Sequence, residues 1–220
     1  MRLKSLAFSV TLLLLGCPLL RAHMVYIVPS DDKSEVRIVF SESLTADSRV
    51  DMQKFVESSF HAFFSGSKRS LDLSQGAHSF QGRLPSGSSV VAGKAVYGIS
   101  PKSDKPTLLV YHPKAILDRK YDASQPLKDA ELEITIQRKG HNVQFRLLAA
   151  GKPVAKAEGM FVLPNGEKVK LLTDQNGLTE SFHVHGRCAV YLRWDQETSG
   201  QVGDTSYEQI RHYATLVIYL

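Results

Sequence analysis

The stretch LEITIQRKGHNVQFRL, residues 132–147, decides the fold class of this chain. Apolar residues occupy every second position of 132–136 and again of 143–147, and the short segment 139–141 separates the two runs. A period of two places one face of each run in a core, which is typical of half-buried strands. Because the separating segment is short and contains Gly140, we expect the two strands to form a β-hairpin.

The same alternation continues outward from this hairpin in both directions. Asn165-Gly166 and Asn176-Gly177 are strong turn signals, since both residue types tolerate positive φ. Only residues 50–56 carry a pattern that could be helical. The other strands are expected at residues 25–27, 36–40, 58–64, 88–97, 107–112, 160–163, 168–172, 178–182, 188–194 and 213–219. Many short strands with regular turns predict an all-β fold of two antiparallel, Ig-like or prealbumin-like β-sandwich lobes.

A polar segment bounded by prolines, residues 113–126, is the best domain boundary. It predicts an N-terminal lobe over residues 23–117, a linker over 118–130 and a C-terminal lobe over 131–220.

Residues 1–22 have the pattern of a secretory signal peptide. Arg2 and Lys4 precede a short apolar run that cannot span a bilayer. We expect cleavage after Ala22, which would make His23 the first residue. The alternative is a lipobox-like match that would make Cys17 a lipid-bearing N-terminus. A secreted or periplasmic location follows from either route, and no later run is apolar and long enough to predict a transmembrane segment.

Charge and cysteine content change when the leader is removed. The whole chain has 27 Lys and Arg against 22 Asp and Glu, a net charge of +5. Without the leader's three cations, 24 basic residues face 22 acidic ones, so nothing suggests nucleic-acid binding. Cys188 would then be the single cysteine, which excludes an internal disulfide.

Cleavage after Ala22 would have a chemical consequence. The freed α-amine and the imidazole of His23 could hold one ion together, and such nitrogen ligands suit Cu(II), Ni(II) or Zn(II). His112, also expected at a strand end, is the most attractive partner, with His61, His212 or Glu42 as a third ligand. The competing interpretation makes His23 an ordinary first strand residue and His112 a buried ring.

A second histidine cluster lies near residue 185. His183 and His185 would share a face if extended, and Cys188 follows three residues later. Such a group could bind Zn(II) or copper. Alternatively, Cys188 belongs to an apolar strand face with Val190, and Gly186 places the histidines in a turn.

Two resemblances add to these patterns. The segments GKPV (151–154), PNGE (164–167) and TDQNG (173–177) are similar to the turns of prealbumin-like or carboxypeptidase-regulatory-like β-sandwiches. Ala22-His23, FSE (40–42), LVYHPKA (109–115) and YEQIRHYATL (207–216) resemble an uncharacterised secreted bacterial family whose members are described as periplasmic components of nickel or cobalt uptake. The second resemblance implies a secreted, β-rich, metal-handling protein with a membrane transporter component as a partner.

Three functions are compatible with these observations. The first is a non-enzymatic metal-binding protein that delivers or buffers nickel, cobalt or copper. The second is a cell-surface interaction module that binds protein or polysaccharide, with Tyr26, Tyr97 or Tyr121 lining an exposed patch. A copper-dependent oxidative enzyme built on the same N-terminal histidine is the third and least favoured. Signatures of other enzyme classes, namely G-x-S-x-G, H-E-x-x-H and the phosphate loop, are missing from the sequence.

Overall fold

β-Strands build almost the whole fold in the computed structural model, which describes residues 23–64, 67–100 and 103–220. The expected leader, with Cys17 and both processing routes, lies outside these residues. The strands are β1 (Met24–Pro29), β2 (Glu35–Ser41), β3 (Glu57–Phe64), β4 (Ser67–Ser70), β5 (Ser74–Gln75), β6 (Ser79–Arg83), β7 (Val90–Ser100), β8 (Thr107–Ile116), β9 (Leu132–Lys139), β10 (Asn142–Ala149), β11 (Lys152–Pro153), β12 (Glu158–Val162), β13 (Lys168–Leu172), β14 (Phe182–His183), β15 (Arg187–Gln196), β16 (Gly200–Val202), β17 (Thr205–Tyr207) and β18 (Gln209–Tyr219). The segment with helical potential contains one 3-10 turn, η1 (Met52–Lys54).

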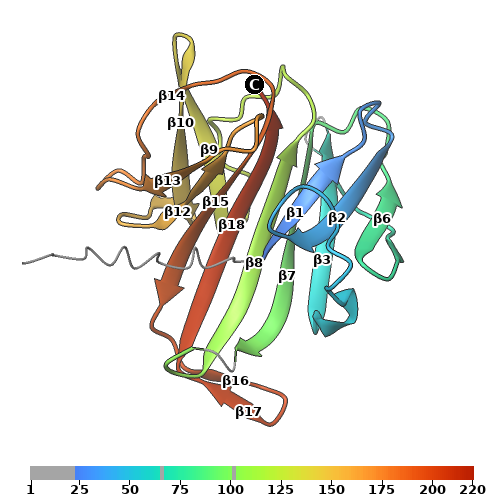
Figure 1. Ribbon diagram of the computed structural model, residues 1–220, viewed down its shortest axis with the longest axis vertical. Coiled ribbons are helices and arrows are strands. Elements are labelled where there is room, and N and C mark those ends of the chain that lie inside the picture. Colours follow the sequence, from blue (N-terminus) through green and yellow to red (C-terminus); the bar gives the residue numbers. More distant parts are fainter. Residues whose placement is uncertain (1–22, 65–66, 101–102) are drawn as a thin grey trace, which may run out of the picture.

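An eight-stranded sheet forms the centre of the molecule, in the order β13-β12-β15-β18-β8-β7-β3-β4 (Figure 1). All its neighbouring strands are antiparallel except β8 and β18, which run parallel over Thr107–Ala115 and Gln209–Val217. The last strand of the chain therefore lies in the middle of this sheet, between β15 and β8.

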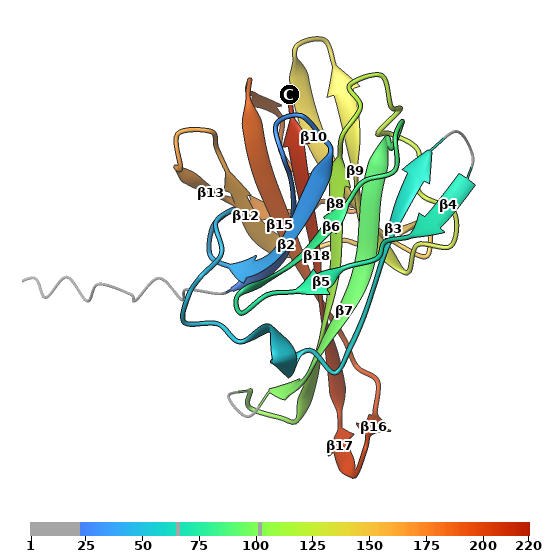
Figure 2. The ribbon, with the colours of Figure 1, turned by 90° about the vertical axis from the view of Figure 1, so that its right-hand side faces the viewer.

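A smaller sheet covers each face of the central one. The sheet β1-β2-β6-β5 packs on the face that carries Tyr111, Ala115 and Val217. The sheet formed by β9, β10, β11 and β14 packs on the face that carries Ile116 and Leu216. Neighbouring residues of one strand point to opposite faces, which is why β8 and β18 contribute to both cores. Figure 2 shows β2 and β6 lying across the front of the central strands, with β9 and β10 behind them.

The hairpin that opened the sequence analysis is confirmed. β9 pairs with β10 in register, with Ile134 opposite Leu147 and Ile136 opposite Phe145, and all four side chains are buried. The Asn-Gly turn between β12 and β13 is also present, and Gly166 has a φ of 84°. The strand expected at residues 178–182 is wrong, since this segment makes only a bridge at Leu178 and the short β14. The all-β sandwich class is confirmed.

The expected boundary at residues 118–130 contains turns and no strand. β8 precedes it and β18 follows it, yet the two strands pair along nine positions. The two lobes thus share the central sheet and lie on its opposite faces. Over the described residues, no helix is long and apolar enough to cross a membrane.

Candidate functional site

The four histidines expected as metal ligands are divided between the two faces of the central sheet. The His23 ring lies 5.4 Å from the Phe40 ring, which in turn lies 5.4 Å from Tyr111. His112 is the next residue along β8, so its side chain points to the face opposite Tyr111. The structure therefore does not bring His23 and His112 together.

His61, His112 and His212 lie on one face. His61 and His112 line the same hollow, of about 210 Å³, while His212 contacts His112 directly. Across the part of the chain that the structure describes, no three His, Cys, Asp or Glu side chains are placed to hold one metal ion.

A hydrogen-bonded histidine pair joins β8 to β18. His112 Nε2 lies 3.0 Å from His212 Nδ1, and His212 Nε2 lies 3.1 Å from Gln196 Oε1. Because the amide oxygen can only accept, we assign the His212 proton to Nε2, so that His112 Nε2–H donates to His212 Nδ1. The Trp194 ring stacks on His212 at 5.2 Å. Sequence analysis named both histidines as ligands, and the structure makes them hydrogen-bond partners.

Burial keeps this pair neutral at neutral pH. Desolvation, the nearby His212 and the Lys94 cation lower the pKa of His112 to about 3. Desolvation also lowers the pKa of His212 to about 4, with Glu131 opposing and Lys94 adding to the shift. A metal ion between the rings would break their hydrogen bond and would meet the field of Lys94. The pair is therefore arranged as a neutral bridge between the two strands.

His23 is held differently. Its Nε2 lies 2.9 Å from Asp47 Oδ2, and Arg49 Nη2 donates to the same oxygen at 2.7 Å. The hydrogen bonds from Arg49, with that from His23, hold the pKa of the Asp47 carboxyl well below its usual range. Asp47 is therefore an ionised acceptor that fixes one ring nitrogen of His23. The other nitrogen, Nδ1, has no hydrogen-bond partner among the described residues.

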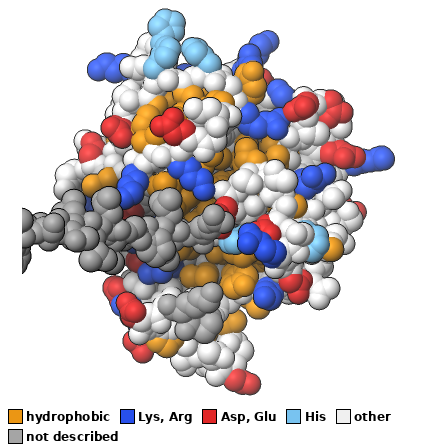
Figure 3. Space-filling model, in the orientation of Figure 1, with side chains coloured by type: hydrophobic (Ala, Val, Ile, Leu, Met, Phe, Trp, Pro, Cys, Tyr) orange, Lys and Arg blue, Asp and Glu red, His pale blue; other side chains and the backbone are white. Residues whose placement is uncertain are grey.

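The expected cluster of His183, His185 and Cys188 does not form. The Cys188 side chain is 1% exposed in the core beneath β9 and β10, and burial raises the pKa of its thiol to about 12. His183 and His185 stay together, with ring centroids 5.1 Å apart. His141, from the β9–β10 turn, approaches His183 to 6.3 Å. Figure 3 shows histidine side chains gathered at this end of the molecule.

The three tyrosines expected to line one exposed patch are also separated. Tyr26 is 2% exposed in the core. Tyr97 packs against the rings of Phe40 and Phe55. Tyr121 lines a cavity at the end of the central sheet where β8 and β18 finish.

That cavity contains residues that sequence analysis did not select. Lys33, Arg119, Arg138 and Arg187 surround it together with Tyr121. Each is an unremarkable basic residue in its own segment, and only the fold brings them together.

No protein-family model matches the chain, and no curated protein matches it.

Proposed function

We propose that this protein binds a transition metal ion at His23 and serves nickel, cobalt or copper uptake or buffering outside the cytoplasm, without catalysing a reaction. The hydrogen bond between His23 Nε2 and Asp47 carries this proposal. It leaves Nδ1, the ring nitrogen nearer to the residue's own backbone, as the one able to bind an ion.

The α-amine supplies the second ligand once the leader has been removed after Ala22. An α-amine has a pKa of about 7.7–8.0, so little free energy is needed to expose its lone pair near neutral pH. The amine and Nδ1 then bind one ion as a chelate. Carboxylates that accept from the far nitrogen of a ligating histidine orient the ring, and Asp47 is placed for this role.

An ion held in this way keeps open coordination positions. Two nitrogen atoms do not fill a closed structural site, which takes four protein ligands for zinc. Solvent or the donor groups of a receiving partner complete the coordination. This favours transient binding and delivery, for which a membrane transporter component is the natural recipient.

The test compares two forms of the protein that differ at the N-terminus. Both begin at His23, but in one of them the α-amine is acetylated, which removes the amine as a ligand. Both carry His183→Ala and His185→Ala, because that exposed pair could bind metal ions by itself. Calorimetric titration with Ni(II) and Cu(II) should show affinity at least about tenfold weaker for the acetylated form, as expected when a chelate loses one ligand.

Two further variants make the result specific. Asp47→Asn should weaken binding by removing the charge that orients the ring, whereas His61→Ala, on the other face, should leave the affinity unchanged. Equal affinity of the two N-terminal forms, or no saturable binding by the form with a free α-amine, would overturn the proposal.

A further inference from the structure

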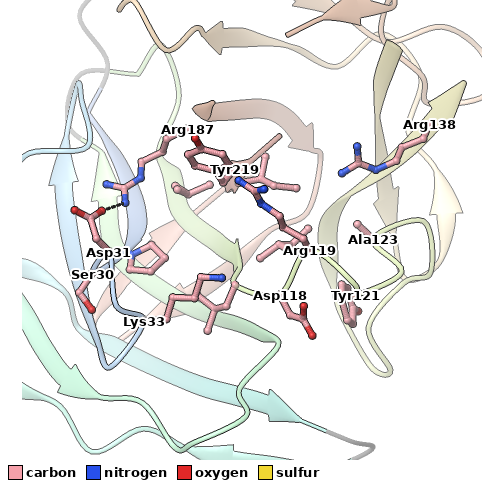
Figure 4. Close-up of a pocket in the computed structure, with 15 residues that line it drawn as sticks. Ser30, Asp31, Lys33, Asp118, Arg119, Tyr121, Ala123, Arg138, Arg187 and Tyr219 are labelled. Atoms are coloured by element: carbon pink, nitrogen blue, oxygen red, sulfur yellow. Dashed lines mark hydrogen bonds and ion pairs between the residues drawn. The ribbon is translucent and has the colours of Figure 1, made fainter. Parts of the chain in front are cut away.

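Four basic side chains from four separate segments surround the cavity near Tyr121. Lys33 comes from the β1–β2 turn, Arg119 from the loop after β8, Arg138 from β9 and Arg187 from the start of β15. The cavity has a volume of about 300 Å³, at the lower end of the range for small-molecule sites. In Figure 4 Lys33 and Arg138 extend toward the cavity from opposite sides, and the Arg119 side chain lies between them with its guanidinium beside Tyr219.

The charges around this cavity do not balance. Two acidic residues, Asp31 and Asp118, line it beside the four basic ones. Asp31 pairs with Arg187 at 2.5 Å, and Asp118 Oδ1 accepts the backbone N–H of Lys120 at 2.9 Å. Within the described part of the chain, no carboxylate forms an ion pair with Lys33, Arg119 or Arg138. The lining therefore has an excess of two positive charges, carried by groups that are free to bind an anion.

The aromatic and apolar residues of the lining indicate that the ligand has an organic body as well as a negative charge. The Arg119 guanidinium lies over the Tyr219 ring, 4.4 Å from its centroid, and both residues line the cavity. A guanidinium held in this way can bind a carboxylate or phosphate group with two parallel hydrogen bonds. Tyr121 is half-buried, and Ile116, Ala123 and Ile218 are buried beneath the charged rim. A bare inorganic ion would not use these surfaces, but the ring of an organic anion would.

We propose that this cavity binds a small acidic saccharide that carries about two or more negative charges. Arg119, Arg138 and Lys33 bind the acidic groups, and the sugar ring packs against Tyr121. The shared chemistry is an oxyanion on a sugar-sized body, which a uronic-acid oligosaccharide or a sugar phosphate can provide. The site is separate from His23 and does not depend on metal binding there.

The test is calorimetric titration of the purified metal-free protein with three probes. Digalacturonate and glucose 1-phosphate carry the two kinds of acidic group, and lactose is a neutral sugar of similar size. Saturable binding of one or both acidic probes, with no binding of lactose, is the expected result. The acidic probe that binds more tightly shows whether the cavity prefers the carboxylates of a uronic-acid oligosaccharide or the phosphate of a sugar phosphate. Chelating agents are removed beforehand, because they are themselves polyanions.

Substitutions assign the binding to the cavity. Arg119→Gln and Arg138→Gln should each weaken binding of the better probe by about tenfold or more, the effect of losing one charged hydrogen bond. Arg37→Gln changes another exposed arginine, on β2, that does not line the cavity, and it should leave the affinity unchanged. Failure of both acidic probes to bind, equal binding of lactose, or equal affinity in the cavity and control variants would overturn the proposal. None of these results bears on metal binding at His23.

Discussion

His112 Nε2 lies 3.0 Å from His212 Nδ1, although one hundred positions separate the two residues in the sequence. Their strands, β8 and β18, form the parallel pair of the central sheet and join the two lobes. Since both rings are buried and hydrogen-bonded, the free energy of unfolding depends on their protonation state.

Acid should weaken the fold through these two rings. Burial lowers the pKa of His112 to about 3 and of His212 to about 4, against about 6.5 in an unfolded chain. Between these values the unfolded chain binds more protons than the folded one, so the free energy of unfolding falls as the pH drops from about 6.5 toward 4. Urea unfolding across this interval should show the decline. A variant with both His112→Phe and His212→Phe should have a flatter profile, and identical slopes would contradict the assignment.

Breaking the buried ion pair between Lys114 and Glu133 should be costly. Lys114 Nζ lies 2.6 Å from Glu133 Oε2, and the two side chains are 2% and 5% exposed. Lys114→Met leaves a buried carboxylate without its partner, which should lower the free energy of unfolding by about 3–5 kcal/mol. The exposed pair of Lys94 and Glu131 is the control. Lys94→Met should change the free energy of unfolding by only about 0–1 kcal/mol. If Lys114→Met and Lys94→Met lower the free energy of unfolding equally in urea, burial does not determine the effect of breaking an ion pair in this protein.

Gly159 should not tolerate a side chain. A Cβ added there would lie 1.9 Å from the backbone oxygen of Tyr191 on the neighbouring strand β15. Gly159→Ala therefore forces the two strands apart and should lower the thermal midpoint strongly. Gly166→Ala is the comparison, because its Cβ meets open space and only the positive φ is unfavourable, at about 1–2 kcal/mol. A smaller effect at Gly159 than at Gly166 would argue against the strand pairing.

The thiol of Cys188 should be unreactive in the folded protein. It is 1% exposed, and burial raises its pKa to about 12, so almost no thiolate is present near neutral pH. In the form that begins at His23, a disulfide reagent should modify this thiol only after urea is added. Rapid modification without denaturant would show that the core beneath β9 opens readily.

The strands could be predicted from the sequence because their information is local. The alternation of residues 132–147 and the turn at Gly166 depend only on neighbouring residues, and both are present in the structure. The parallel pairing of β8 with β18 could not be predicted, since no periodicity connects segments so far apart. That pairing decides which histidines come into contact. The sequence favours His23 as the partner of His112, whereas in the structure His112 contacts His212.

The cavity lined by basic residues could not be predicted from the sequence for the same reason, because distant segments form it. Lys33, Arg119, Arg138 and Arg187 each lie in a polar setting that is typical of solvated surface. Their proposed common function depends on three-dimensional proximity and on a lining in which only Asp31 and Asp118 oppose four cations, and sequence spacing contains neither. Asp47 could have been selected from the sequence only if its loop had been placed beside His23.

The central position of β18 has a consequence for how the chain is made. Until the ribosome has added this final strand, β15 and β8 have unpaired edges, and such edges invite pairing with other chains. The N-terminal lobe cannot mature first and wait for the other, because both cores include residues of the last strand. Folding of either lobe must therefore wait until β18 has been synthesised, and a chain that stops before residue 209 would leave two hydrophobic interiors open at once.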